Sequence, residues 1–280
     1  MSSVEEKRRA FRALHDKGCF VMPNPYDMGT ARYLAGRGFK ALATTSSGAA
    51  WSYGFPDGGL GRDVMLEHIA EIAAVSDLPV NADFLNGFAD EPEDLIPNVA
   101  LCIGTGVAGL SIEDMDASQQ LYDIGLAVDR IRAARQALDD DGTGVLLVAR
   151  CEAFLLGHPD ALRIAVDRLE RFAEAGADCL YAPDVTRPED IATIVRAVAP
   201  KPVNVLARNL GGLTVADLAA LGVRRISLGG GLARLAWTAV MRASEELAAG
   251  RLDATGDAVS GAALNALFAD DAGQAEQGPA

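Results

Sequence analysis

The stretch VAGLSIEDMD, residues 107–116, decides the fold, because a short apolar run ends there in two adjacent carboxylates, Glu113 and Asp114. The apolar runs on either side also end in polar residues: PVNADF stops just after Asp83, and GVLLVAR stops at Arg150. Buried strands that turn polar only at their carboxyl ends are typical of a parallel α/β barrel, in which these side chains converge at one face. The sequence therefore predicts a working centre built from Asp83, Glu113 and Arg150.

The composition favours one large, acidic domain. At 280 residues the chain has the length of a single α/β barrel, and half of its residues are hydrophobic, which suffices for a sizeable core. With 25 basic against 39 acidic residues the formal net charge is −14, which argues against nucleic acid or an anionic membrane as a partner. No apolar run approaches the ~20 residues of a membrane helix, and the start MSSVEEKRRAF lacks the apolar core of a signal peptide. The sequence thus predicts a soluble, cytoplasmic protein whose four separated cysteines are reduced thiols.

An alternation of short apolar segments and helical segments repeats eight times along the chain. The expected strands are residues 19–23, 41–46, 79–83, 109–113, 145–150, 179–182, 203–206 and 225–228, and the expected helices are 28–35, 62–75, 91–103, 125–138, 161–175, 188–198, 214–220 and 232–248. Eight parallel strands with intervening helices close most simply into a (β/α)8 barrel of the TIM type. The competing doubly wound open sheet is less favoured, because both GxGxxG after the first strand and GxxxxGK[ST] are missing.

The two ends of the chain are expected to add helices to this single domain, which spans residues 1–280. A helix within residues 1–18, ended by a glycine, would cap one end of the barrel. The extension 249–280 contains an expected helix at 255–269 that one barrel does not need. That helix is therefore predicted to pack on a neighbouring subunit, and the acidic end beyond it to be frayed.

Carboxylates predominate at the carboxyl ends of the expected strands, with one arginine among them. The end residues are Asn24, Asp27, Ser46, Ser47, Asp83, Glu113, Asp114, Arg150, Glu152, Asp184, Asn204 and the glycines 229–231. Such a cluster of acids repels itself unless a cation joins it, and oxygen ligands completed by water suit Mg2+ or Mn2+. The alternative is that Glu113 and Asp114 only cap the next helix or pair with an arginine. No lysine stands at a strand end and no group of histidines reaches the mouth, which argues against Schiff-base chemistry and a zinc site.

Three further features lie near these ends. The turn TTSSG, residues 44–48, is either a cradle for a carboxylate or phosphoryl group or an ordinary tight turn. Glycines 211–212 and 229–231 follow the last two strands, where many barrels bind phosphate, so a phosphorylated ligand stays open. Cys151 is expected to face the helix layer rather than the mouth, since neighbouring strand residues point to opposite faces.

Five motifs occur in order along these units: TTSSGAAWSYGFPDGG, NADFLNGF, SIED, the AR of VAR, and PVNVL. Together they resemble the isocitrate lyase and phosphoenolpyruvate mutase superfamily, over residues 20–242. The resemblance implies a modified barrel that binds Mg2+ and makes or breaks a carbon–carbon or carbon–phosphorus bond next to a 2-oxo acid, through an enolate. It also implies a homotetramer, or a dimer, in which a C-terminal helix is exchanged between subunits.

The resemblance implies roles for single residues as well. Those expected to hold the 2-oxo acid are Ser46, Ser47, Gly48 and Ala49, with Asn204 as a further polar contact. Those expected at the metal ion are Asp83 and Glu113, directly or through water, and Asp57, through water. Arg150 would hold the substrate carboxylate, a task that suits the planar fork of a guanidinium. The implied catalytic residues are therefore Arg150, Glu113 and Asp57.

The chain departs from the superfamily pattern at several places, two of which bear directly on the chemistry. Asn81-Ala82-Asp83 stands where many members carry Asp-x-Asp, so a neutral residue replaces an acidic ligand. The isocitrate and methylisocitrate lyases carry a Lys-x-Cys-Gly-His loop, whereas this chain has the shorter MDASQQLYDIG, without Cys, Lys or His. The general acid of those two lyases is therefore missing, and Ser118, Tyr122 and Tyr181 remain as candidates for a proton donor.

These observations predict a Mg2+-dependent carbon–carbon lyase that acts on a small 2-oxo or 2-hydroxy dicarboxylic acid, by cleavage or decarboxylation through a metal-bound enolate. One alternative within the same superfamily is carbon–phosphorus bond chemistry on a phosphonopyruvate-like substrate. Another is a non-catalytic protein that still binds 2-oxo acids but has lost the catalytic loop.

Overall fold

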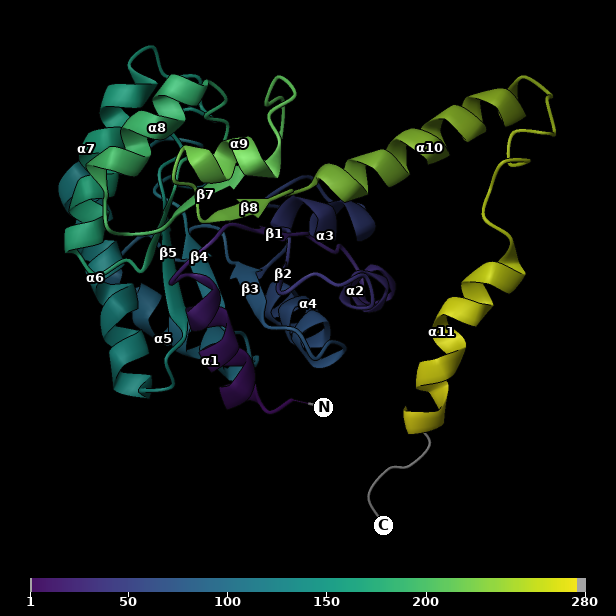
Figure 1. Cartoon of the computed structure of the whole chain (residues 1–280), viewed down its shortest axis with the longest axis horizontal. Helices are drawn as coiled ribbons and strands as arrows, with labels where there is room; N and C mark the ends of the chain where they lie inside the picture. Colours follow the sequence, from purple (N-terminus) through teal and green to yellow (C-terminus); the bar gives the residue numbers. More distant parts are fainter. Residues whose placement is uncertain (1, 276–280) are drawn as a thin grey trace. The chain divides into compact units, whose positions relative to one another are not determined.

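Eight parallel strands form the centre of the computed structural model, which describes residues 2–275 (Figure 1). The strands are β1 (Phe20–Met22), β2 (Leu42–Ala43), β3 (Val80–Asp83), β4 (Gly109–Ile112), β5 (Leu146–Arg150), β6 (Cys179–Tyr181), β7 (Val203–Leu206) and β8 (Arg225–Ser227). Their order along the sheet is β1-β8-β7-β6-β5-β4-β3-β2, so β1 and β8, the first and last strands of the chain, are hydrogen-bonded neighbours. The predicted (β/α)8 barrel is confirmed as a nearly closed ring.

Helices follow the strands and cover the outside of the ring (Figure 1). They are α2 (Met28–Ala35), α4 (Arg62–Ala74), α5 (Pro92–Gly104), α6 (Ile124–Asp141), α7 (Ala161–Glu174), α8 (Pro188–Ala197) and α9 (Val215–Ala220). A further helix, α10 (Gly231–Ala248), follows β8 in the chain, and most of it belongs to a separate compact unit. Apolar side chains on the outer face of the strands, such as Leu110, pack against the helices, for example against Val99 of α5 and Ile131 of α6, in the largest core cluster. The expected alternation of strands and helices is therefore confirmed, with ends displaced by a few residues.

The segment after β2 differs from the expectation. The sequence predicts a loop over residues 47–61, but its first part forms a helix, α3 (Ser46–Ser52). Thr45 caps this helix, because its Oγ1 accepts a hydrogen bond from Gly48 N at 3.2 Å. A Cβ at Gly48 would lie 2.9 Å from Tyr26 Cβ, so the helix packs closely on the turn after β1. A run of Ser, Gly and Ala has no hydrophobic period, which is why sequence reasoning missed this helix.

The helix α1 (Val4–Leu14) plugs the amino-terminal end of the barrel, as predicted for the capping helix. Its Phe11 is fully buried in a cluster with Met22 of β1 and Leu146 of β5. Gly109 makes room for this ring, because a Cβ there would lie 2.7 Å from Phe11 Cε1. A ligand therefore has to approach from the other end, where the strands have their carboxyl termini.

A buried arginine, Arg225 of β8, lies in the barrel interior. Its Nε donates to Asn204 Oδ1 at 2.9 Å, and its Nη1 donates to Asn81 Oδ1 at 3.3 Å. Burial lowers the pKa of Arg225, since these neutral amides do not offset the loss of water. Asn81, the neutral residue that departs from the superfamily pattern, thus supplies an acceptor for a buried guanidinium.

The seam of the ring lies between β1 and β2, where Ala43 N donates to Pro23 O at 3.1 Å. The Asn24 side chain joins the two sides of this seam. Its Nδ2 donates to Thr44 O at 2.7 Å, and its Oδ1 accepts from the backbone N–H groups of residues 228–229 at 2.8 and 3.0 Å. Asn24, expected only as a polar strand end, is therefore buried as a structural link between β2 and β8.

The described residues divide into two compact units, one up to Ala233 and one from Arg234 onward. The second unit contains most of α10 and the helix α11 (Gly261–Ala275), which begins later than the expected 255–269. Of the C-terminal extension expected over 249–280, residues 276–280 lie outside the described residues, as does Met1. None of the described helices is both long and apolar enough to cross a membrane.

Candidate active site

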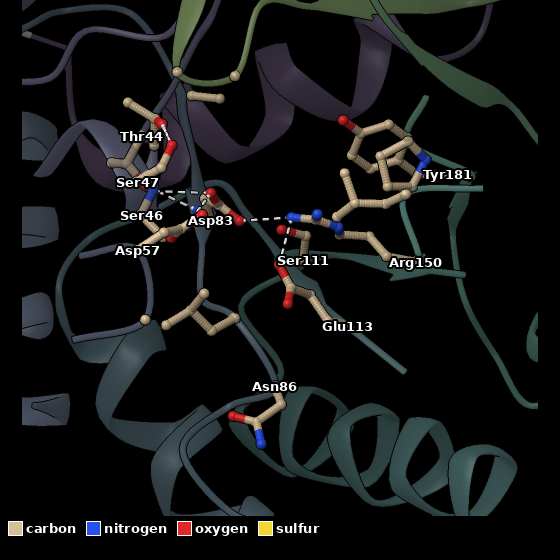
Figure 2. A pocket seen from close by; sticks show the side chains of 18 of the residues that line it. Thr44, Ser46, Ser47, Asp57, Asp83, Asn86, Ser111, Glu113, Arg150 and Tyr181 are labelled. Carbon is tan, nitrogen blue, oxygen red and sulfur yellow. Dashed lines mark hydrogen bonds and ion pairs between the residues drawn. The ribbon is translucent and has the colours of Figure 1, made fainter. Parts of the chain in front are cut away.

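Arg150, at the end of β5, is the hub of the polar side chains at the barrel mouth (Figure 2). Its Nη1 lies 2.8 Å from Asp83 Oδ1 and 2.8 Å from Glu113 Oε1. Asp83 ends β3 and Glu113 follows β4, so three neighbouring strands bring one side chain each to the same point. The structure therefore brings Asp83, Glu113 and Arg150 together, as the sequence predicts.

A third carboxylate, that of Glu152, holds the other edge of the guanidinium. Arg150 Nε donates to Glu152 Oε1 at 2.7 Å, and Nη2 donates to Oε2 at 3.3 Å. The Glu152 side chain has no exposed surface, so this paired geometry is shielded from water. Sequence reasoning placed Glu152 at a strand end without a role, although its i, i+2 spacing from Arg150 puts both side chains on the same face.

Asp114 and Arg168 support Glu152 from behind. Asp114 Oδ1 accepts from Glu152 N at 2.8 Å, while Asp114 Oδ2 lies 3.1 Å from Arg168 Nη1. Arg168 Nη2 also donates to the Tyr122 backbone O at 2.6 Å. Arg168 was missed, because it lies on α7 and far from any strand end. A sign was present in the sequence, since Arg168 interrupts the apolar stripe of α7 that contains Ala161, Ala165 and Phe172.

The electrostatic balance of this cluster favours an added cation. When ionised, Asp83, Glu113 and Glu152 carry three negative charges around the single positive charge of Arg150. Burial raises the pKa of Glu113 well above its usual range; Arg150 opposes this, while Glu152 and Asp83 add to it. Burial likewise raises the pKa of Glu152 to about 7, against the opposing effect of Arg150. A bound cation would relieve this repulsion and favour the ionised forms of Glu113 and Glu152.

The oxygen donors at the mouth fit a hard divalent cation that keeps part of its water shell. Within residues 2–275, no three or more His, Cys, Asp or Glu side chains form a metal-binding group. Asp83 and Glu113 nevertheless meet at one point, and the Ser46 hydroxyl and Asp57 lie beside Asp83 (Figure 2). Two carboxylates with water in the other positions are a ligand set typical of Mg2+.

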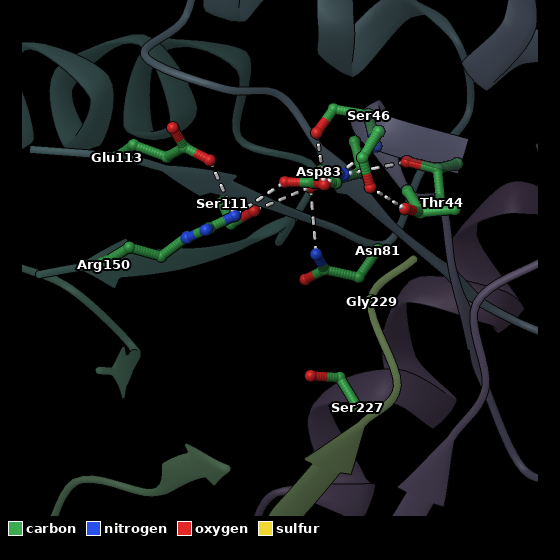
Figure 3. A network of polar contacts seen from close by, with 12 residues as sticks. Thr44, Ser46, Asn81, Asp83, Ser111, Glu113, Arg150, Ser227 and Gly229 are labelled. Atoms are coloured by element: carbon green, nitrogen blue, oxygen red, sulfur yellow. Dashed lines mark hydrogen bonds and ion pairs between the residues drawn. The ribbon is translucent and has the colours of Figure 1, made fainter. Parts of the chain in front are cut away.

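Ser46, the first residue of α3, and Thr44 just before the helix fix the orientation of Asp83 (Figure 3). Both the backbone N and the Oγ of Ser46 donate to Asp83 Oδ2, at 2.9 and 2.8 Å, and Asp83 N donates to Thr44 Oγ1 at 2.9 Å. Ser46 and Ser47 line the cavity at the mouth, whereas Gly48 and Ala49 are buried and do not line it. Of the four residues expected at the 2-oxo acid, the structure thus places two at the cavity and two behind it.

Asp57 and Asn204 both reach the same cavity. Partial desolvation raises the pKa of Asp57, and the nearby negative charge of Asp83 raises it further; Arg150 opposes both. Asn204 is fully buried, and its Nδ2 donates to Ser227 Oγ at 2.9 Å. Because Asp57 is exposed and Asn204 is not, Asp57 lies at the outer rim of the cavity and Asn204 belongs to its floor.

The cavity has a volume of about 550 Å3, which suits a small organic acid with an ion and water. Of the three candidates for a proton donor, Tyr181 lines it, with Arg150 Cζ 5.1 Å from the centre of its ring. Burial raises the pKa of Tyr181 to about 12, so the hydroxyl keeps its proton at neutral pH. Ser118 and Tyr122 do not line the cavity. Cys151 lies in the core between strands and helices, as expected, and burial raises the pKa of its thiol.

The short loop after the Glu-Asp pair folds back on itself. Met115 and Leu121 form an antiparallel bridge, and Asp116 Oδ1 accepts from the N–H groups of Ser118 and Gln120, at 2.8 and 2.9 Å. The Tyr122 hydroxyl, at the end of this loop, donates to Asp90 Oδ1 at 2.5 Å. The loop is therefore joined to the segment after β3 as a compact wall of the cavity.

A family model and a bacterial protein match most of the chain. The model of the phosphoenolpyruvate phosphomutase family matches residues 11–248. An uncharacterized protein of Mycobacterium tuberculosis is 36% identical over 223 residues, which make up 79% of this chain and 81% of that protein. The match to the family model includes all eight βα units.

Two crystal structures resemble the whole chain. A candidate lyase/mutase from Burkholderia cenocepacia J2315 is 45% identical with a TM-score of 0.89, over 95% of this chain and 96% of that chain. The structure of 2,3-dimethylmalate lyase, a PEP mutase/isocitrate lyase superfamily member, is 25% identical with a TM-score of 0.85, over 99% and 98% of the two chains. The motifs, the barrel and these matches agree: the chain belongs to the isocitrate lyase/phosphoenolpyruvate mutase superfamily.

Proposed function

We propose that this protein is a metal-dependent lyase that cleaves or decarboxylates a small 2-oxo or 2-hydroxy dicarboxylic acid through an enolate. The observation that carries the proposal is the meeting of Asp83, Glu113 and Arg150 at one point of a cavity at the barrel mouth. Superfamily membership supports it, because relatives in this superfamily are carbon–carbon lyases and mutases that generally depend on a divalent metal ion. A 2,3-dimethylmalate lyase, whose name denotes a 2-hydroxy diacid, is one structural neighbour.

In this proposal Asp83 and Glu113 hold Mg2+, or Mn2+, and Asp57 contacts it through water. The ion would act as a Lewis acid that stabilises the negative charge developing on the 2-oxo acid. Ser46 keeps Asp83 turned toward the ion through its two hydrogen bonds to Oδ2. Ser47 and Asn204 line the cavity beside the substrate, and Gly48 and Ala49 shape the turn behind it.

Arg150 has the task of holding the substrate carboxylate. A cation held by Asp83 and Glu113 would balance their charge and leave Nη1 of Arg150 free for the substrate, while Glu152 would still hold Nε and Nη2. The guanidinium is thus kept in orientation when its two other partners change. Tyr181 is the proton donor that the geometry favours, because it lines the cavity beside Arg150 and keeps its proton at neutral pH.

A second candidate function is carbon–phosphorus bond chemistry on a phosphonopyruvate-like substrate. It is favoured by the phosphomutase family model and by Gly229 and Gly230, which line the cavity after β8. A third candidate is a non-catalytic protein that binds 2-oxo acids. It is favoured by the loop over residues 115–122, which forms a compact wall without the Cys, Lys or His of the related lyases.

We also propose a homotetramer or dimer that exchanges its C-terminal helix, in the cytoplasm. The apolar side chains of Leu235, Trp237 and Val240 on α10 are 67, 46 and 55% exposed, which suits burial against a second copy of this chain. All four cysteines are free, as expected in a reducing compartment. Light scattering of the full chain tests the assembly, and a monomer at micromolar concentration would contradict it.

The function is tested with a panel of 2-oxo and 2-hydroxy diacids, following product release with and without EDTA. We expect turnover of at least one diacid, lost on chelation and restored by Mg2+. In parallel, oxalate with Mg2+ should raise the melting temperature of the wild type, and Asp83→Ala and Glu113→Ala should abolish this rise. Asp129→Ala, which removes an exposed carboxylate of α6, is the control and should respond like the wild type.

Each outcome separates the candidates. Release of phosphate from a phosphonopyruvate-like compound, with the diacids inert, would favour carbon–phosphorus chemistry. Oxalate stabilisation without turnover of any compound would favour the binding protein. Unchanged oxalate stabilisation in both alanine variants would remove Asp83 and Glu113 from the metal site.

A further inference from the structure

The wall of the cavity is electrically asymmetric. Its acidic lining residues are Asp57, Asp83, Asp90, Glu113 and Asp116, which lie at the end of β3 or in the segments that follow β2, β3 and β4. The lining residues that follow β6, β7 and β8, within the described part of the chain, include no acid. A diacid whose first carboxylate is held at Arg150 therefore meets several lining carboxylates on one side of the cavity and none among the lining residues of the other.

The acid-free side carries an arginine, Arg208, in the turn that follows β7. Its Nη2 is paired with Asp184 Oδ2, in the turn that follows β6. The Arg208 side chain is 40% exposed and the Asp184 side chain 19%, so the carboxylate is the more buried partner, and Arg208 lines the cavity. One acceptor occupies only part of the five-donor fork of an arginine, which leaves N–H groups for a ligand.

The two other arginines that line the cavity are already engaged. Arg150 is surrounded by Asp83, Glu113 and Glu152. Arg225 is 2% exposed, and its Nε and Nη1 donate to amide oxygens of the cavity floor. Of these three guanidinium groups, that of Arg208 is the one with both exposed surface and few protein acceptors.

We propose that Arg208 binds the carboxylate of the substrate that is remote from the 2-oxo or 2-hydroxy group, and so selects diacids over monoacids. Asp184 acts as the positioning residue, because its single charged contact holds the guanidinium toward the cavity. The inference rests on the proposed function, since it presumes that the first carboxylate lies at Arg150. To the proposed function it adds the residue that binds the remote carboxylate of the substrate.

The test compares ligands that differ only at the far end. Oxaloacetate and 2-oxoglutarate are diacids, and 2-oxobutanoate and 2-oxopentanoate carry a methyl group where these have the remote carboxylate. Binding is measured by calorimetry in the presence of Mg2+, with oxalate as the shortest diacid, which has no carbon between its two carboxylates. We expect at least one diacid to bind the wild type about 10- to 100-fold more tightly than its matched monoacid, the range of a charge-assisted arginine contact.

Arg208→Gln should remove this preference while leaving oxalate binding unchanged, and Arg208→Lys should restore part of it. Any turnover should show the loss in KM rather than kcat. The control Arg163→Ala removes an exposed arginine of α7, paired with Asp160, and should keep the preference. Asp184 Oδ1 is buried without a hydrogen-bond partner within residues 2–275, so Arg208→Gln leaves the Asp184 carboxylate without its paired cation. If this single variant unfolds, the double variant Arg208→Gln/Asp184→Asn, which also removes the negative charge, is tested in its place.

A diacid preference that persists in Arg208→Gln would overturn the inference, as would a wild type that binds diacids and monoacids equally. Both results leave the proposed function intact, provided that oxalate still binds with Mg2+. A wild type that fails to bind oxalate in Mg2+ would instead overturn the proposed function itself.

Discussion

Replacing Arg168 by methionine should destabilise the fold strongly, although this residue lies behind the site. Methionine keeps the volume of the long side chain but removes the contacts of Nη1 with Asp114 and of Nη2 with the Tyr122 backbone. Two hydrogen bonds of a charged group contribute about 1.5 to 3 kcal/mol each, and breaking a buried ion pair typically costs about 3 to 5 kcal/mol. We therefore expect Arg168→Met to lower the free energy of unfolding by about 3 to 5 kcal/mol at pH 8.

The loss should shrink as the pH falls, because of Asp114. Burial raises the pKa of this carboxyl, and Arg168 is the largest influence that opposes the rise, so its removal raises the pKa further. Protonation of Asp114 in the folded state then stabilises the variant at low pH, and this stabilisation is lost as the pH rises through the new pKa. Urea unfolding at pH 5 and pH 8 measures both effects.

A matched control lies one turn further along α7. Arg171 Nε is 3.1 Å from Asp167 Oδ1, but both side chains are about half exposed, so Arg171→Met should change the free energy of unfolding by about 0.5 kcal/mol or less. A loss below about 1 kcal/mol in Arg168→Met, or a loss equal to that of Arg171→Met, would refute the role given to the buried pair. In the double variant Arg168→Met/Asp114→Asn the loss should be partly recovered, since no charge is left without a partner.

Two further predictions concern Arg150 and its partner. Arg150→Lys should weaken Mg2+-dependent oxalate binding about tenfold although the charge is kept, because an ammonium group lacks the planar fork that contacts a ligand and Glu152 together. Calorimetry measures the affinity, and a wild-type value in the variant would contradict this prediction. In the metal-free protein the pKa of Glu152 is about 7, raised from 4.5, so between these pH values folded Glu152 keeps a proton that the unfolded chain has lost. The stability that this proton contributes is present below pH 4.5 and is lost as the pH rises through 7. Glu152→Gln should flatten the pH dependence of the melting temperature over this window, and an unchanged slope would count against the raised pKa.

The barrel and the meeting point of its polar side chains were predictable from local patterns. Apolar runs of strand length that end in Asp83, Glu113 and Arg150 place these residues at one edge, because all strands of a parallel barrel run in the same direction. The alternation of side chains along a strand also predicts that Cys151 faces away from the mouth, and the structure confirms this. These inferences need only the sequence along one strand at a time.

The contacts around the meeting point were not predictable, because they depend on which side chains lie near each other in space. The sequence shows one arginine among many acids, but not that Arg150 takes three of them as partners. Arg168 reaches the site from the helix layer, and α3 is built from small residues without a hydrophobic period. Asp184 and Arg208 come from two different turns, which no sequence spacing relates.

The link made by Asn24 affects where the barrel opens first in local unfolding. Between β1 and β2 the backbone ladder is short, and a single carboxamide bridges the gap to the amides beyond β8. Local opening needs few broken contacts there, so we expect it to start at this point, ahead of the long pairings between β4 and β5. Fluctuations of the molecule would then concentrate beside the glycines that border the entrance, and the opposite arc with Arg150 and Glu113 would keep its shape while ligands come and go.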